Sequence, residues 1–338
     1  YVQNEDSEDV VVTNPEPLVQ NPTGYSQTSF MQKLRFKPNK RLNFNYGVHY
    51  SATTDVPRYD RLIRTKDGNP RSGEWHYGPQ IWAMNNIEVT HESPTKLYNE
   101  INMRLAHQFF KESRIDRDFN KPTRTNRIEK VNAYSWNLDL KKLLGEKHQF
   151  FYGTDLVIND VRSSATTKDI NTGTIKGGAT RYPNSLWQSY AGYLSYHYKA
   201  SQKVLIQVGA RYNQFTLDSE FDTTFYPLPF TEAHINNRAT TGSIGVRFNP
   251  NEKWTLSANL ASGFRAPNVD DIGKVFDSEP GAVVVPNLDL TPEYSYNAEL
   301  SITKIFSDFL KIDLTGFYTF LNDALVRRDY QLNGQDSI

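Results

Sequence analysis

The sequence predicts an all-β fold, the wall of an antiparallel transmembrane β-barrel with short periplasmic turns and long extracellular loops. Three observations predict it. Segments of about ten residues alternate between apolar and polar side chains, short turn sequences recur along the chain, and aromatic residues make up 13% of the 338 residues. About twelve strands can be recognised, a number typical of a large barrel rather than a small sheet.

The alternation is clearest in residues 41–50, where Leu42 and Phe44 share one face of a strand while Asn43 and Asn45 share the other. Five further segments show the same pattern: 134–140, 204–211, 254–260, 297–303 and 310–315. An apolar face suits contact with lipid, and a polar face suits a hydrated lumen.

Six short turn sequences each join two predicted strands into a hairpin. They lie at 37–40, 92–95, 144–147, 200–203, 249–253 and 306–308. Longer polar stretches lie between the pairs, as expected for extracellular loops. We therefore assign all of 1–338 to one partial barrel domain, with an extracellular loop at 1–24, six hairpins in 25–328, and the start of another extracellular loop at 329–338. We expect the chain to be truncated at both ends.

Composition excludes several other classes of protein. No run of about 18 to 20 uncharged apolar residues is present, so the chain has no membrane-spanning helix. Cysteine is absent, which removes disulfides and thiolate metal sites. Lys+Arg and Asp+Glu balance at 38 each, so no strong charge indicates nucleic acid as a partner. The sequence implies no metal site and no cofactor.

Two alternatives need to be weighed. A soluble β-sandwich would also alternate, but its strands are usually shorter, about 5 to 6 residues, and mid-strand charges suit a hydrated lumen better. An enzyme is disfavoured because no Ser/His/Asp or paired-carboxylate arrangement stands out, and we assign no catalytic residues. Residues 65–73 lack the GxxxxGK[ST] spacing of a phosphate-binding loop, so we predict a turn-rich outer loop there.

The most specific local feature lies near the C-terminal end. Residues 262–267 read Ser-Gly-Phe-Arg-Ala-Pro, and after a loop residues 286–293 read Pro-Asn-Leu-Asp-Leu-Thr-Pro-Glu. This run resembles the FRAP-type and NxxL/KPE-type segments of TonB-dependent outer-membrane receptors. The residues that carry the resemblance are Phe264, Arg265, Ala266, Pro267, Asn287 and Leu288.

The resemblance implies a barrel of about 22 strands in the outer membrane of a Gram-negative bacterium, surrounded by its lipid. It implies TonB-dependent uptake of a scarce nutrient, such as an iron-siderophore, haem or a cobalamin-like compound, bound as a small-molecule ligand in the outer loops. The TonB complex would act through a plug domain and a TonB box, neither of which is recognised in this chain. A passive porin-like channel and an outer-membrane adhesin stay open as alternatives.

Few residues stand out as ligand contacts. If the alternation from Trp254 continues, Phe264 faces lipid and Arg265 faces the lumen, where it would meet an anionic ligand, the plug, or a neighbouring carboxylate. Asn268 is expected to cap a short helix over 269–275.

Four further outer-loop side chains are candidates for ligand contact: Trp75, His76, Tyr77 and His234. No histidine lies in 268–285, which weakens haem as the ligand of that loop.

Overall fold

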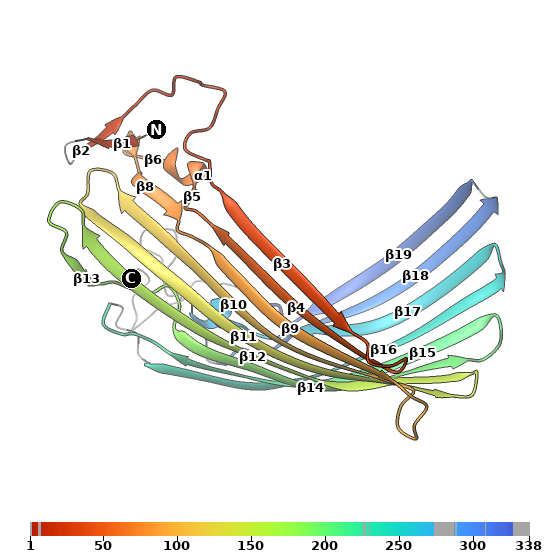
Figure 1. Cartoon of the computed structure of the whole chain (residues 1–338). Helices are drawn as coiled ribbons and strands as arrows, with labels where there is room; N and C mark the ends of the chain where they lie inside the picture. The colour runs from red at the N-terminus through yellow and green to blue at the C-terminus, as the bar shows by residue number, and fades with distance from the viewer. Residues whose placement is uncertain are drawn as a thin grey trace.

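The computed structural model describes residues 2–5, 8–225, 228, 230–273, 287, 289–307 and 309–326. Its main feature is one antiparallel sheet of fifteen strands, twelve of which form a continuous path in the order β19-β18-β17-β16-β15-β14-β12-β11-β10-β9-β4-β3. The sheet curves into an open trough with β3 and β19 along its two edges (Figure 1). The predicted all-β antiparallel architecture is confirmed. Among the described residues, no helix is long and apolar enough to cross a membrane.

The twelve strands follow one another in an up-and-down order. They are β3 (Gln27–Phe36), β4 (Leu42–Thr53), β9 (Ile81–Glu92), β10 (Glu100–Asp118), β11 (Thr123–Leu144), β12 (His148–Asp169), β14 (Asn184–Lys199), β15 (Val204–Glu220), β16 (Glu232–Asn251), β17 (Trp254–Arg265), β18 (Glu293–Ser307) and β19 (Leu310–Asn322). The six predicted turns each lie between two neighbours in this order, all at the end of the trough drawn on the right in Figure 1. We call this the turn end and the opposite end the outer end.

The small elements lie in the remaining segments. They are β1 (Val2–Glu5), β2 (Glu8–Val11), β5 (Val56–Pro57), α1 (Tyr59–Leu62), β6 (Thr65–Lys66), β7 (Asn69–Pro70), β8 (Ser72–Tyr77), β13 (Ile175–Gly177) and α2 (Val269–Gly273). The turn-rich loop predicted for 65–73 contains the β6–β7 hairpin, where Asp67 and Gly68 have φ of 52° and 81°. Positive φ at both central residues is what a two-residue hairpin turn requires.

Several strands are longer than a membrane crossing requires. An outer-membrane strand needs about 9 to 11 residues to cross, whereas β11 and β12 each have 22. The connection after β10 is short for this reason, because the β10–β11 ladder continues to Arg117 and Arg124 and leaves only 119–122 between the two strands. The charged side chains of this extension lie on hydrogen-bonded strands.

The two faces of the sheet differ as the alternation predicts. One face carries exposed apolar side chains such as Leu260, Leu300 and Leu314, and we call it the lipid face. The other, the inner face, carries paired charges: the Asp139 carboxylate accepts hydrogen bonds from Arg104 and from the Tyr193 hydroxyl. Farther along, Arg211 pairs with Asp155 and Asn137 donates to it. Polar groups that would be costly in lipid are therefore paired on one face.

The N-terminal segment differs from the prediction. A strandless loop was expected over 1–24, but β1 and β2 form a small hairpin there. The hairpin is attached to the outer end through Asp9, whose carboxylate accepts two hydrogen bonds from the Arg117 guanidinium, at 2.7 and 2.8 Å. Sequence periodicity cannot reveal a contact between residues so far apart. The predicted loop at 329–338 lies outside the described residues.

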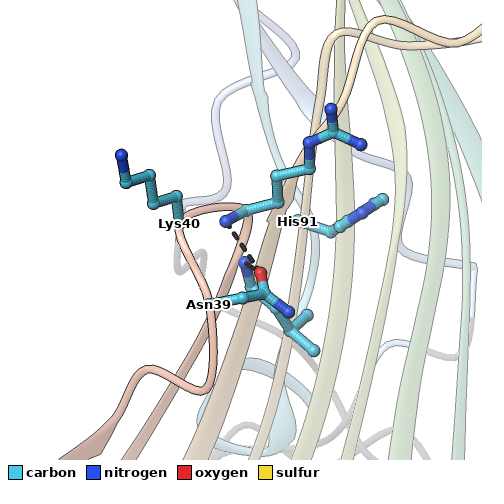
Figure 2. A pocket seen from close by; sticks show the side chains of 5 residues that line it. Asn39, Lys40 and His91 are labelled. Carbon is cyan, nitrogen blue, oxygen red and sulfur yellow. Dashed lines mark hydrogen bonds between the residues drawn. The ribbon is translucent and has the colours of Figure 1, made fainter.

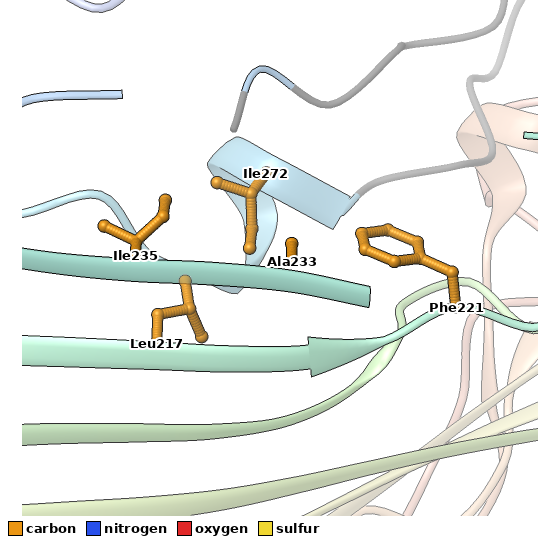
Figure 3. Packing of buried hydrophobic residues seen from close by; sticks show 5 residues of the cluster. All are labelled: Leu217, Phe221, Ala233, Ile235 and Ile272. Atoms are coloured by element: carbon orange, nitrogen blue, oxygen red, sulfur yellow. The ribbon is translucent and has the colours of Figure 1, made fainter. Parts of the chain in front are cut away.

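Helix α2 forms the only apolar core cluster found among the described residues. Ile272 of α2 is fully buried against Leu217, Ala233 and Ile235 of β15 and β16, with Phe221 alongside (Figure 3). Leu217 has the same strand parity as Arg211, so this cluster lies on the inner face. The helix expected over 269–275 is present up to Gly273, and residue 275 lies outside the described residues.

Candidate functional site

The Arg265 side chain joins both ends of the segment between β17 and β18. Its Nη1 donates to the Glu293 carboxylate at 2.8 Å, and its Nη2 donates to Asp271 of α2 at 2.6 Å. Glu293 is also its partner in the β17–β18 ladder. Arg265 is thus paired with carboxylates, the structural alternative that the sequence left open.

Phe264 does not face lipid as predicted. Its ring stacks on Phe215, with centroids 6.3 Å apart and planes 13° apart, and Phe215 is fully buried on the inner face. The β16–β17 ladder ends at the pair of Ser243 and Ala261. Beyond that pair β17 is no longer held in the sheet by β16, which frees Phe264 to reach Phe215.

The other motif residues are structural in different ways. Pro267 is fully buried, and its carbonyl accepts a hydrogen bond from the Trp187 indole at 3.3 Å. Ala266 is half-buried beside it. Asn287 accepts a hydrogen bond from the Asp289 amide at 3.0 Å. Leu288 lies outside the described residues.

A pocket of about 360 Å³ lies between the start of α2 and the inner face. Its lining residues are Val131, Asn159, Val161, Tyr182, Trp187, Asn268, Val269 and Asp270. The Tyr182 hydroxyl donates to Asp270 at 2.9 Å and closes one side. Burial raises the pKa of Tyr182, so it stays a donor at neutral pH. Apolar walls with a few oriented polar groups are typical of a small-molecule site.

Two aromatic rings and three arginines form a second cluster at the outer end. The Trp75 and Tyr77 rings meet edge to face at 5.3 Å. The Arg58 guanidinium lies over both rings, at 5.3 and 5.1 Å, and donates to the Tyr77 hydroxyl at 2.6 Å. Arg61 lies over Trp75 at 5.6 Å, and Arg114 lies over Tyr77 at 5.5 Å. We call these five side chains the arginine–aromatic cluster.

Positive charge is concentrated around α1. Burial and the nearby charges of Arg64 and Arg58 lower the pKa of Arg61. The hydrogen bond from Arg58 lowers the pKa of Asp60, so that carboxylate is ionised but is shared among neighbouring arginines. Like charges held this close create a positive potential that an anion would relieve.

Arg114 connects this cluster to the pocket. Its Nη2 pairs with Glu112 at 2.6 Å, and its Nη1 lies 4.0 Å from the Glu129 carboxylate. Glu129 is only 6% exposed, and neither of its carboxylate oxygens has a hydrogen-bond partner among the described residues. It lies two residues from Val131, a wall of the pocket, on the same strand face. A buried carboxylate without hydrogen-bond partners is unfavourable, so Glu129 would be stabilised by a hydrogen-bond donor from a ligand or from another part of the protein.

The two predicted histidines lie elsewhere. His76 points to the face opposite Trp75 and Tyr77, between Glu74 at 3.3 Å and Asp55 at 3.5 Å. His234 pairs with Asp218 and is well exposed on the lipid-face side of β16. The structure therefore brings Trp75 and Tyr77 together but leaves both histidines outside the site. Among the described residues, no group of His, Asp or Glu is arranged to hold a metal ion.

Sequence reasoning missed Tyr182, Trp187 and Glu129. A signal was available in the alternation itself, because Val161 and Trp187 are large apolar residues at positions that should be polar. Large apolar side chains on an otherwise polar inner face predict that another segment of the protein packs against them. They do not reveal that α2 is what covers them.

Comparison with known proteins agrees with this architecture. Residues 14–336 match the family model described as TonB dependent receptor-like, beta-barrel. The iron-regulated outer membrane virulence protein of Vibrio cholerae serotype O1 is 26% identical over 309 residues, which are 90% of this chain and 40% of that protein. The chain therefore spans less than half the length of the curated relatives it matches.

Solved structures share the fold at low identity. The copper transporter OprC aligns with a TM-score of 0.71 at 10% identity, covering 89% of this chain and 45% of OprC. The ferric citrate transporter FecA gives 0.67 at 13%, covering 92% and 45%. The ferric yersiniabactin uptake receptor FyuA from Yersinia pestis gives 0.65 at 14%, covering 91% and 46%. With the family match over most of its length, the chain belongs to the TonB-dependent receptor family and forms part of its β-barrel.

Proposed function

We propose that the whole protein is an outer-membrane receptor that captures a scarce nutrient at its outer end for TonB-dependent uptake. The nutrient would be an iron-siderophore, haem or a cobalamin-like compound. The TonB complex would act through a plug, and the membrane would be the outer membrane of a Gram-negative bacterium. The observation that supports this most is the pocket under α2, with the arginine–aromatic cluster beside it.

The charge of the site favours an anionic metal chelate. Arg58, Arg61 and Arg114 present guanidinium groups that suit carboxylate, catecholate or phosphate oxygens. The Trp75 and Tyr77 rings supply flat surfaces for a planar part of the ligand.

Binding can be tested on the purified full-length receptor through its tryptophan fluorescence. The probes are ferric citrate, a ferric tricatecholate, haem and cyanocobalamin. We expect one anionic chelate to quench the fluorescence saturably. The double variant Arg58→Gln/Arg114→Gln should weaken that binding about 100-fold or more, since hydrogen bonds to charged groups contribute about 1.5 to 3 kcal/mol each.

Arg162→Gln is the matched control, because Arg162 lies on the opposite face of β12 and is 60% exposed. It should leave binding unchanged. Equal losses in the control and the double variant, or no saturable binding of any probe, would contradict the proposal. Uptake by cells that is indifferent to loss of TonB would instead support a passive channel.

A further inference from the structure

A second pocket lies far from the ligand site, at the turn end. Its volume is about 340 Å³, and it is lined by Asn39, Lys40, Arg41, Leu42 and His91. In Figure 2 the Lys40 side chain and the His91 ring lie on either side of Asn39. The Asn39 side-chain oxygen accepts hydrogen bonds from the Arg41 and Leu42 amides, at 2.8 and 3.0 Å, and fixes the shape of the turn.

This pocket opens on the lipid face. Leu42 and His91 are directly opposite each other in the β4–β9 ladder and point to the same side as Phe44 and Val89. The His91 Nδ1 is hydrogen-bonded to the Tyr98 hydroxyl at 2.9 Å, so its Nε2 is the atom available to a ligand. Lys40 and Arg41 therefore lie at the end of a row of apolar side chains, Leu42, Phe44 and Val89, that lipid acyl chains would cover.

The carboxylate nearest in sequence does not neutralise the pocket. Glu92 follows His91 directly in β9, so its side chain points to the inner face, whereas Leu42 and His91 point to the lipid face. Its amide donates to the Arg41 carbonyl at 2.8 Å, which anchors the turn to β9. Positive charge at the pocket is thus left facing the membrane.

The whole turn end is basic. Its exposed cations in the described part of the chain are Lys37, Lys40, Arg41, Lys96, Lys147, Lys199, Lys203, Lys253 and Lys311. Its exposed carboxylates in the same part are Glu92, Glu146, Glu252 and Asp313, the last paired with Lys311 at 3.1 Å. Because the chain has no net charge, this excess is a local feature. A basic rim attracts anionic lipid headgroups by about 1 kcal/mol per cation near the surface.

Aromatic residues also lie near the turn end on the lipid face. Tyr196 stacks on Phe150 at 4.8 Å, and His148 stacks on Tyr198 at 5.1 Å. Tyrosine rings at this height are typical of the headgroup region of a membrane. These aromatic residues support a headgroup environment for the turn end, where the pocket lies.

We propose that the pocket of Asn39, Lys40, Arg41, Leu42 and His91 binds the phosphate group of an anionic glycerophospholipid in the leaflet on the turn side. The Lys40 ammonium, the Arg41 guanidinium and the His91 Nε2 surround the phosphate. The acyl chains run along Leu42, Phe44 and Val89. The site is separate from nutrient capture, and its failure would leave the proposed function untouched.

Native mass spectrometry of the full-length receptor, released from mixed-lipid nanodiscs, tests this directly. We expect phosphatidylglycerol to be retained over phosphatidylcholine. Lys40→Gln/Arg41→Gln should weaken phosphatidylglycerol retention about 10- to 30-fold. Lys147→Gln/Lys203→Gln removes two rim cations from other turns and should change retention less than about twofold.

Three results would overturn the proposal. The first is equal retention of the two lipids by the unmodified receptor, a measurement that needs no variant to fold. The second is equal loss in both double variants, which would mean a diffuse rim effect. The third is competition by millimolar inorganic phosphate as strong as by phosphatidylglycerol, which would indicate a site for free anions.

Discussion

Asp9 and Arg117, 108 residues apart in the sequence, form a buried two-point ion pair on the outer extension of the sheet. The Asp9 side chain is fully buried and that of Arg117 is 4% exposed. Asp9 also accepts a hydrogen bond from the Asn120 amide at 2.6 Å, and its own amide donates to the Asn120 side chain. This pair, rather than apolar packing, holds the N-terminal segment against β8 and β10.

Replacing Arg117 with Met should therefore release the N-terminal segment. Removing one partner of a buried ion pair costs about 3 to 5 kcal/mol, because the other charge is left uncompensated. We expect limited proteolysis of the full-length receptor to cleave within residues 8–24 much faster in the variant. Arg124→Met is the control: Arg124 is 39% exposed, so its loss should have little effect. Equal cleavage of both variants would contradict the role of Asp9.

Arg265→Met should loosen the base of the β17–β18 segment without unfolding the barrel. Arg265 is 47% exposed, so its two ion pairs contribute at most about 1 kcal/mol each. The expected result is faster amide hydrogen exchange in α2 and at the start of β18, with little change in the unfolding temperature. A large fall in that temperature would show that Arg265 supports the sheet as a whole.

Ile272→Ala tests whether α2 maintains the ligand pocket. Ile272 is fully buried against Leu217 and Ile235, and an Ile-to-Ala change in such a place costs about 2 to 5 kcal/mol. We expect α2 to detach from the inner face and the fluorescence response to ligand to fall. Val326→Ala is a control of similar chemistry, because Val326 is 64% exposed. Unchanged ligand binding by Ile272→Ala would exclude α2 as a wall of the site.

Gly153→Ala should destabilise the barrel wall. A side-chain carbon at Gly153 would collide with the Leu138 carbonyl and lie 2.8 Å from the Tyr193 hydroxyl, which crosses Gly153 to reach Asp139. Overpacking of this kind costs about 1 to 3 kcal/mol. Urea unfolding of the receptor in detergent measures it. At Gly192 the nearest atom is 3.9 Å away, so Gly192→Ala should change stability much less.

The strands and the turns were predictable because both signals are local. Alternation at Leu42 and Asn43 depends on neighbours in one strand, and each turn is set by a few consecutive residues. The docking of α2 and of Asp9 depends on contacts between distant segments, which no periodicity encodes. The position of Phe264 was mispredicted because a regular ladder was assumed beyond Ala261, where the pairing with β16 ends.

The candidate site was predictable only in part. Trp75 and Tyr77 stood out as loop aromatics, but their partner Arg58 lies 17 and 19 residues away across a helix and two short strands. His76 stood out equally, yet the strand geometry of β8 turns it to the other face. Neighbours in a strand lie on opposite faces, so a sequence triplet cannot form one site.

His76 should make the outer loop more stable in mild acid than in mild base. Its hydrogen bond to Glu74 and the nearby charge of Asp55 raise its pKa above the usual 6.5. Because the folded state binds the proton more tightly than the unfolded state, the stabilisation is complete below pH 6.5 and is lost as the pH rises through the raised pKa. Amide exchange in residues 54–77, corrected for intrinsic rates, should therefore lose protection from pH 6 to about pH 8.

His76→Gln removes the titrating group and should flatten this dependence, whereas His234→Gln should leave it unchanged. His234 pairs with Asp218 on β16, away from this loop. If protection rose with pH in the unmodified receptor, or if His76→Gln kept the same slope, the loop would be governed by another group. Glu74 would then be the first candidate, since it contacts Arg117 and Arg124 as well as His76.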